Sequence, residues 1–242
     1  MRVTAFCPGH ITGFFLPCEH ENPMLTGSRG AGICIDRGVT TTVSSRPGSG
    51  RIDVLVDGVR GGGGVTATAV GLLLGNMDID ITVESFLDLP AIAGFGTSAA
   101  GALSASFALA DILGLPAEDA FAAAHLAELR HHTGLGDVAA LSRGGMTFRR
   151  RQGLPPHGQI DRLEYSGDIV AAVVGGELRT ADVLHDPRKR AEIVEAGTEC
   201  LRKLDLDPTA VSFFTLSREF TERCGIAGER VREVLRAADG QI

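Results

Sequence analysis

Tryptophan is absent from this sequence of 242 residues, and tyrosine occurs only once. Proteins that bind single-stranded nucleic acid by base stacking need aromatic side chains on their surface, so this class is disfavoured. Basic residues are also in the minority, because 23 Lys and Arg stand against 30 Asp and Glu and give a formal net charge of −7. An acidic chain is a poor candidate for non-specific binding to a phosphate backbone. We therefore expect no nucleic-acid partner.

The cysteines indicate neither a disulfide framework nor a zinc site, since their number is odd and no CxxC pair occurs. The five are Cys7, Cys18, Cys34, Cys200 and Cys224. No uninterrupted apolar run approaches the ~20 residues that a membrane-spanning helix needs. The opening residues, MRVTAFCPGH, lack the apolar stretch of a signal peptide. We therefore expect a cytoplasmic protein without a membrane partner.

What the sequence does contain is enough apolar residues, 44%, to form a core. Runs of β-branched or alternating residues between turn signals predict strands, at Arg2–Phe6, Gly32–Ser44, Asp53–Val56, Ile79–Ser85, Met146–Arg151, Asp161–Tyr165 and Asp168–Val174. Helices are predicted at Val65–Leu74, Ser98–Leu113, Pro116 to about His132, Pro187–Leu204, Pro208–Cys224 and Ala227–Ala238. A cluster of proline and glycine near Gly153–Gln159 predicts a boundary between a domain of residues 1–155 and a shorter one of residues 156–242.

The most informative segment is PAIAGFGTSAAG, residues 90–101, which lies between a predicted strand and a predicted helix. The N-terminus of a helix presents unpaired N–H groups and a partial positive charge, and therefore attracts phosphate. Gly94 and Gly96 would let the backbone approach such an anion closely. The hydroxyls of Thr97 and Ser98 stand in the first turn, where one can cap the helix and another can reach a metal or a phosphate oxygen.

Three interpretations of this loop compete. A P-loop is excluded, because that motif requires Gly-Lys-Ser/Thr and Gly101 is followed by Ala102 and Leu103. The dinucleotide-binding pattern GxGxxA is matched by Gly94, Gly96 and Ala99, although Pro90 lies where that pattern needs a strand. The third interpretation is the phosphate loop of the GHMP kinases, Pro-x-x-x-Gly-Leu-Gly-Ser-Ser-Ala-Ala, which the segment resembles with Phe95 and Thr97 as its two departures.

Two acidic residues, Glu128 and Asp137, follow nine positions apart in the next predicted helix and the turn after it. Glu128 shares a helix face with His125, three residues earlier. A carboxylate on this alanine-rich face is costly to bury unless a cation lies near it, and Mg²⁺ would serve. Asp137 follows the turn TGLG, which can aim a side chain rigidly into a cleft, although Asp137 could equally cap the next helix. The spacing from Glu128 to Asp137 resembles that of the metal ligand and the base in GHMP kinases.

The N-terminal segment PGHITGFF narrows the resemblance. It occupies the place of the first GHMP kinase motif, Ala-Pro-Gly-Lys/Arg, with His10 in place of the basic residue. Together with GSRGAG from Gly27, GFGTSAAGAL, HLAE, TGLGDV and Gly144-Gly145, it resembles the archaeal pantoate kinases. The matches extend from about Pro8 to Thr180. The resemblance implies a two-lobed α+β fold, with an N-terminal lobe like domain 2 of ribosomal protein S5 and a shortened, ferredoxin-like C-terminal lobe.

The resemblance also implies ATP, Mg²⁺ and pantoate as ligands, phosphorylation of the 4-hydroxyl of pantoate for coenzyme A synthesis, and a homodimer. It implies that Asp137 is the base, and that Ser98 and Glu128 hold the metal. The nucleotide-binding residues would be Gly94, Phe95, Gly96, Thr97, Ser98 and Ala99. The substrate-binding residues would be Ser28, His125, Arg149, Thr180 and His10. A guanidinium suits the carboxylate of pantoate because it can bind both oxygens, and alternation along the strand would turn Arg150 away from the side that Arg149 faces.

Other functions stay open at this point. Another GHMP kinase, of the homoserine or mevalonate type, would share the same loop. An inactive nucleotide-binding regulator is favoured by the lack of a third glycine-rich motif late in the chain and opposed by Glu128 and Asp137. A dehydrogenase would use GxGxxA to bind a nicotinamide cofactor without magnesium.

Overall fold

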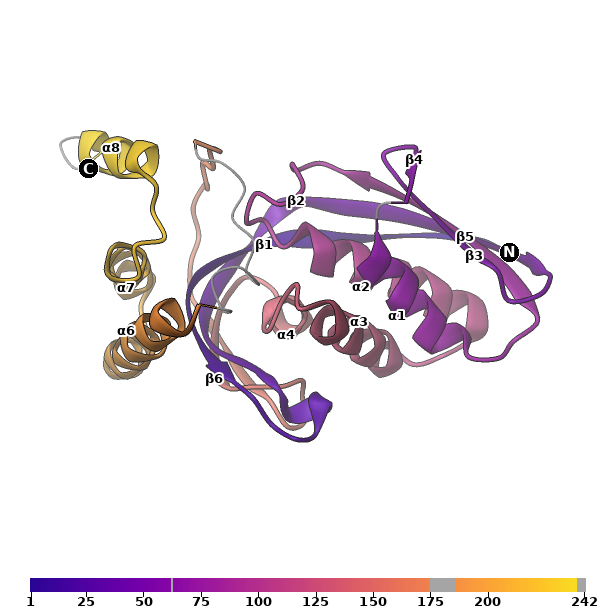
Figure 1. The fold of residues 1–242 in the computed structure, drawn as a ribbon, viewed down its shortest axis with the longest axis horizontal. Helices are drawn as coiled ribbons and strands as arrows, with labels where there is room; N and C mark the ends of the chain where they lie inside the picture. Colours follow the sequence, from indigo (N-terminus) through magenta and orange to yellow (C-terminus); the bar gives the residue numbers. More distant parts are fainter. Residues whose placement is uncertain (62, 175–185, 239–242) are drawn as a thin grey trace.

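The fold, obtained as a computed structural model that describes residues 1–61, 63–174 and 186–238, combines one sheet with two groups of helices (Figure 1). The strands are β1 (Arg2–Cys18), β2 (Gly27–Pro47), β3 (Ile52–Val56), β4 (Val59–Arg60), β5 (Ile79–Leu87), β6 (Met146–Arg151) and β7 (Gln159–Leu163). The helices are η1 (Pro23–Leu25), α1 (Gly64–Leu74), α2 (Thr97–Leu113), α3 (Ala117–His131), α4 (Asp137–Arg143), α6 (Pro187–Leu206), α7 (Ala210–Arg223) and α8 (Glu229–Ala238).

The long strand β2 is the centre of the sheet. It pairs antiparallel with β1 along nearly its whole length, with β6 near its start and with β5 near its end. Apart from β1, which pairs with β2, the strands follow the order β4-β3-β5-β2-β6-β7 across the sheet. β3 and β5 form the one parallel pair among the strands of the described residues. A dinucleotide-binding fold requires parallel strands joined by crossover helices. This largely antiparallel sheet therefore excludes the dehydrogenase interpretation and confirms an α+β fold.

β1 and β2 curve strongly halfway along their length (Figure 1). The register between them shifts twice: next to Pro8 and Gly9, where β2 has the extra residues, and between Thr12 and Phe14, where β1 has one. Such bulges bend a strand and redirect its side chains. The segment Gly9–Thr12 thus lies at the bend, and the backbone N–H of His10 donates a hydrogen bond to the carbonyl of Phe95, at 2.9 Å. The bend therefore fixes β1 against the glycine loop before α2.

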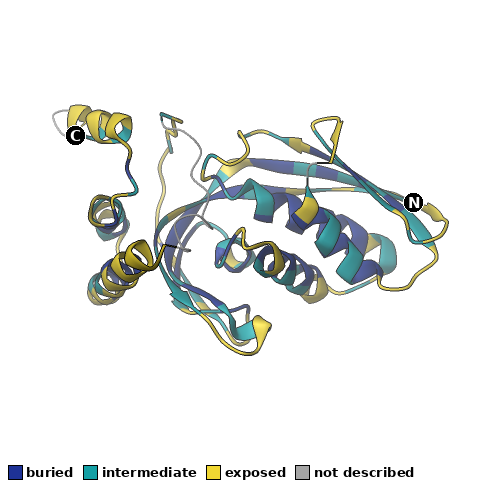
Figure 2. Ribbon diagram, viewed as in Figure 1, coloured by how far each residue is buried: buried dark blue, intermediate teal, exposed yellow. Residues whose placement is uncertain are grey.

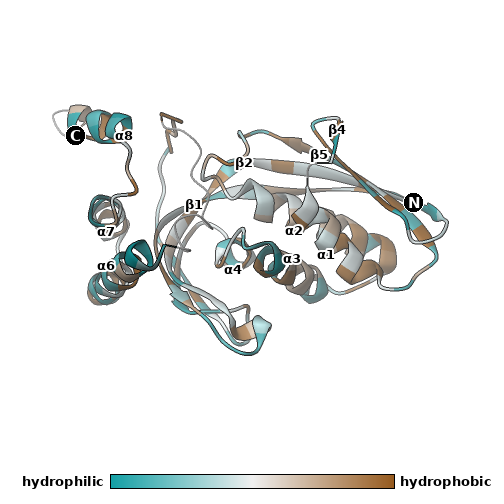
Figure 3. Ribbon diagram, viewed as in Figure 1, coloured by the Kyte–Doolittle hydropathy of each residue, from teal (hydrophilic) through white to brown (hydrophobic). Residues whose placement is uncertain are grey.

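Helices α1 to α4 fill the concave side of the sheet, with their more buried and more apolar faces turned inward (Figures 2 and 3). α2 packs directly on β1 and β2, and α3 packs on α1 and α2. α2 approaches closely because its buried face consists mainly of alanine, with Ala99, Ala100 and Ala102 fully buried. Buried hydroxyls then fix its position along the strands, since Thr41 Oγ1 lies 2.9 Å from Ser85 Oγ and 2.7 Å from Ser104 Oγ. These contacts hold α2 in one place relative to β2 and β5.

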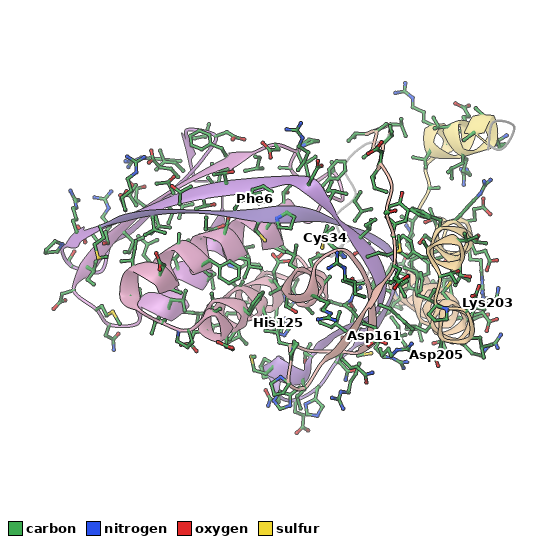
Figure 4. All side chains as sticks on the ribbon, turned by 180° about the vertical axis from the view of Figure 1, so that it is seen from behind. Phe6, Cys34, His125, Asp161, Lys203 and Asp205 are labelled. Carbon is green, nitrogen blue, oxygen red and sulfur yellow. The ribbon has the colours of Figure 1, made fainter. Side chains whose placement is uncertain are left out.

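α6 and α7 cover the other side of the curved sheet, where they form a separate core with the opposite faces of β1, β2 and β6. Arg150 joins these layers, because it pairs with Asp161 on β7 and with Asp205 on α6 (Figure 4). It also lies over the ring of Phe148, on the α6 side of β6. Arg149 faces the concave side, so the predicted alternation of these two arginines is confirmed.

Most predicted elements are present, and the differences lie near the end of the sheet. The strand predicted at Asp161–Tyr165 is β7, two residues earlier. The strand predicted at Asp168–Val174 is wrong: this segment forms no strand, and Val170 is 95% exposed. An apolar run of this kind needs paired neighbours, and β7 has no further strand beside it within the described residues.

The predicted boundary between residues 155 and 156 falls inside the hairpin of β6 and β7. The sheet of the first domain thus continues beyond the boundary, and the division into 1–155 and 156–242 stays a prediction. In the part of the chain that the structure describes, no helix is long and apolar enough to cross a membrane.

Candidate active site

The glycine loop ends at α2 with an open helix N-terminus. Gly94 and Gly96 adopt the left-handed conformation, with φ of 84° and 62°, which favours glycine. The N-cap residue of α2, Gly96, has no side chain to cap the helix, so among the described residues the first amides of α2 are left available to an anion. Phe95 is buried, and its carbonyl is held by His10. The loop therefore has the geometry of a phosphate-binding turn.

Glu128 lies next to this helix start. The residue is only 3% exposed, and its Oε1 accepts hydrogen bonds from Ser98 Oγ at 2.6 Å and Thr133 Oγ1 at 2.8 Å. Burial, aided by the nearby charge of Asp137, raises the pKa of Glu128 to about 7, although the hydrogen bonds from Ser98 and Thr133 oppose this shift. A buried carboxylate with hydroxyl donors and no cationic partner among the described residues is well suited to a bound cation.

Asp137 begins α4 and is the more accessible of the two acids, with a side chain that is 20% exposed. Its Oδ1 lies 2.6 Å from Nδ1 of the fully buried His10 and 3.4 Å from the Thr12 hydroxyl. Burial alone would raise the pKa of Asp137, but the hydrogen bond and charge of His10, together with the charge of Arg149, hold it below its usual value. An ionised carboxylate that a ligand can reach is a candidate proton acceptor.

The turn TGLG brings these groups together by lacking side chains at two points. A Cβ at Gly134 would lie 2.2 Å from Glu128 Oε2 and 3.0 Å from Asp137 Oδ2. The two carboxylates therefore flank one glycine. A Cβ at Gly136 would lie 2.4 Å from Ser28 Oγ and 2.8 Å from Arg149 Nε. The absence of a side chain at Gly136 therefore leaves room for the side chains of Ser28 and Arg149.

Arg149 is a buried cation without a full set of partners. It is 1% exposed, its Nε lies 3.4 Å from the Ser28 carbonyl, and Nη1 has no hydrogen-bond partner among the described residues. Burial lowers its pKa, which the charges of Asp137 and Cys34 oppose, but an arginine stays charged in proteins. Since a buried guanidinium with a free N–H is costly, the site is suited to a carboxylate or phosphate group of a ligand.

The remaining predicted residues have distinct positions. His125 is buried on α3, and its Nε2 lies 3.2 Å from the Pro23 carbonyl of η1; burial lowers its pKa (Figure 4). His10 contacts Asp137 through Nδ1, and its Nε2 points at Gly32. A substrate contact by either histidine stays a prediction. Thr180 lies outside the described residues.

Thr12 and Thr133 are site residues that the sequence analysis missed. Thr12 stands two residues after His10 on a strand, and this spacing alone places both side chains on one face. Thr133 is the first residue of the TGLG turn. No group of three or more His, Cys, Asp or Glu side chains among the described residues could hold a metal by itself. Mg²⁺ at nucleotide sites commonly takes one or two protein carboxylates and completes its shell with phosphate and water, and Ser98 and Glu128 fit that pattern.

Comparison with known proteins agrees with this geometry. Residues 61–145 match the family model of the GHMP kinases N terminal domain. The chain is 34% identical to a pantoate kinase of Methanospirillum hungatei over 98% of this chain and 81% of that protein, and 34% identical to a pantoate kinase of Thermococcus kodakarensis over 99% and 81%. A solved structure described as a phosphotransferase related to the CoA biosynthesis pathway superposes with a TM-score of 0.85 at 29% identity, covering 99% of this chain and 81% of that one.

The chain therefore belongs to the GHMP kinases. Within them, it is a member of the pantoate kinase family, since its identity to curated pantoate kinases extends over nearly its whole length.

Glu128→Gln tests the burial of this carboxylate. Because its pKa is raised to about 7, the folded protein keeps a proton between pH 4.5 and 7 that the unfolded chain loses. Wild-type stability should therefore fall as the pH rises through this range. Relative to wild type, the variant should gain about 3 kcal/mol of unfolding free energy between about pH 5 and about pH 8. Denaturant unfolding without nucleotide or metal measures this difference, and an equal difference at both pH values would contradict the assignment.

Proposed function

We propose that the protein transfers the γ-phosphoryl group of ATP to the 4-hydroxyl of pantoate. One observation carries this proposal: the open start of α2, two carboxylates and a buried guanidinium converge around a single turn, residues 133–137. These are the parts that phosphoryl transfer to a carboxylate-bearing alcohol requires. The similarity to curated pantoate kinases supports pantoate as that alcohol.

Each group has a definite part in the reaction. The free amides at the start of α2 bind phosphate oxygens, and Ser98 and Glu128 would hold Mg²⁺ beside them. When bound, this cation supplies positive charge against the charge that develops on the transferred group. Asp137, held by His10, orients the alcohol and accepts its proton. Arg149 binds the carboxylate of pantoate, with Ser28 beside it.

A panel of alcohols tests the substrate. ATP consumption with Mg²⁺ should be fastest with pantoate and much slower with pantothenate, homoserine and mevalonate. A preference for homoserine or mevalonate would assign the protein to another branch of GHMP kinase activity. No consumption with any alcohol, in a protein that still binds ATP, would favour the inactive regulator. The homodimer and the cytoplasmic location stay predictions, which sedimentation and cell fractionation can test.

Asp137→Asn tests the base. Asparagine keeps the shape of the side chain and its oxygen can still accept the His10 hydrogen bond, so the site should stay assembled. We expect kcat to fall by about 10²–10⁴-fold, because the proton acceptor is lost, while the Kd for ATP changes little. Steady-state kinetics and equilibrium nucleotide binding measure the two quantities, and a kcat near that of wild type would refute the assignment.

Arg149→Ala tests the carboxylate site. Loss of charged hydrogen bonds should raise KM for pantoate by roughly 10- to 100-fold and leave KM for ATP within about threefold. Arg149→Lys keeps the charge but not the paired N–H donors of the guanidinium. Its KM for pantoate should therefore lie between that of the wild type and that of Arg149→Ala. Equal effects on pantoate and ATP would move the carboxylate site elsewhere.

A further inference from the structure

After the last residue of α3, the chain turns back so that Thr133 contacts the end of that helix. His132 adopts the left-handed conformation, with φ of 54°, although it is not a glycine. The next residue then turns back, and the backbone N–H of Thr133 donates to the Glu128 carbonyl at 3.2 Å. This is a common helix C-terminal arrangement. Its consequence here is that the Thr133 side chain lies over the residue five positions earlier, Glu128.

Thr133 uses this position to contact the carboxylate. Its hydroxyl lies 2.8 Å from Glu128 Oε1 and 3.4 Å from the Glu128 carbonyl, so the carboxylate is the better acceptor. Ser98 Oγ donates to the same Oε1 at 2.6 Å. One oxygen of Glu128 thus receives two hydroxyl donors, from the start of α2 and from the turn after α3.

The other oxygen is left open. Glu128 Oε2 has no hydrogen-bond donor among the described residues, and it points toward Gly134, across which lies Asp137 Oδ2. With a single donor, the plane of a carboxylate can rotate about its terminal bond, whose torsion is broad. Two donors from different directions on one oxygen favour a single orientation of this plane, and in that orientation the other oxygen faces Gly134.

We propose that Thr133 is a positioning residue that fixes the free oxygen of Glu128 for the divalent cation beside the nucleotide. The inference rests on the proposed function for the cation itself, but it concerns the orientation of Glu128, which binding measurements can follow without turnover. Loss of a hydrogen bond to a metal-ligating side chain commonly lowers the affinity for the metal. Because the Thr133 side chain is exposed, its replacement removes little packing.

Thr133→Val tests the proposal, since valine has the shape of threonine without the hydroxyl. Binding of Mn²⁺ to the protein with a non-hydrolysable ATP analogue, followed by the electron paramagnetic resonance signal of free Mn²⁺, is the main readout. The affinity for Mn²⁺ should fall by about tenfold in Thr133→Val and return to within about threefold of wild type in Thr133→Ser, which keeps the donor. The Mg²⁺ concentration for half-maximal kcat should rise in parallel.

Thr198→Val is the matched control. Thr198 is also exposed, and its hydroxyl donates to the Val194 carbonyl within α6 at 2.6 Å. Its replacement should leave Mn²⁺ binding unchanged. Unchanged Mn²⁺ binding in Thr133→Val would overturn the proposal and leave Thr133 as a helix terminus only. An equal loss in the valine and serine variants would also overturn it, because the effect would not depend on the hydroxyl.

Glu128→Gln separates this inference from the proposed function. Weak Mn²⁺ binding in that variant, with unchanged binding in Thr133→Val, contradicts the role of Thr133 alone. Wild-type Mn²⁺ binding in Glu128→Gln contradicts the metal site itself. Absence of pantoate phosphorylation by the wild-type protein contradicts the substrate assignment and leaves the metal-binding series interpretable.

Discussion

The hydrogen bond between Ser98 and Glu128 is the contact on which the site depends. It joins the first turn of α2 to the last turn of α3, and it does so in the interior, where an ionised carboxylate is costly to hold. The alanine-rich face of α2 makes this contact possible, because small side chains bring the two helices close. The same packing places the open helix end beside Glu128. On the proposed function, anion binding and cation binding thus both depend on one helix–helix contact.

The turn of residues 133–137 shows how the absence of side chains can organise a site. Neither Gly134 nor Gly136 is among the glycines with a positive φ, so neither is needed for a left-handed turn. They are needed because carboxylate, hydroxyl and guanidinium groups press against their Cα atoms. A pattern of glycines in a loop therefore has two physical meanings here: conformational freedom at Gly94 and Gly96, and clearance at Gly134 and Gly136.

Ser98, Glu128 and Asp137 could be predicted as site residues for two reasons. Each lies in or next to a helix whose start and end signals are local, and their spacing resembles that of the GHMP kinases. The pairing of His10 with Asp137 was not predicted, since it joins residues 127 positions apart and depends on two register shifts between β1 and β2. The role of Thr133 was missed because it requires a left-handed histidine, which sequence rules assign to glycine or asparagine. The strand predicted at Asp168–Val174 is wrong for a different reason. Apolar residues favour a strand, but a strand also needs a neighbouring strand to pair with, and the local sequence does not show whether one is present.

Electrostatics link the proton acceptor to the carboxylate site. The charge of Arg149 is among the causes that keep the pKa of Asp137 low, and Asp137 in turn offsets the burial of Arg149. On the proposed function, a substrate carboxylate at Arg149 offsets part of that positive charge, so the pKa of Asp137 rises when the alcohol arrives. A base whose pKa lies nearer the working pH accepts a proton more readily. On the proposed function, the same guanidinium both binds the substrate and adjusts the base, which would explain why a costly buried arginine stands beside the Asp137 carboxylate.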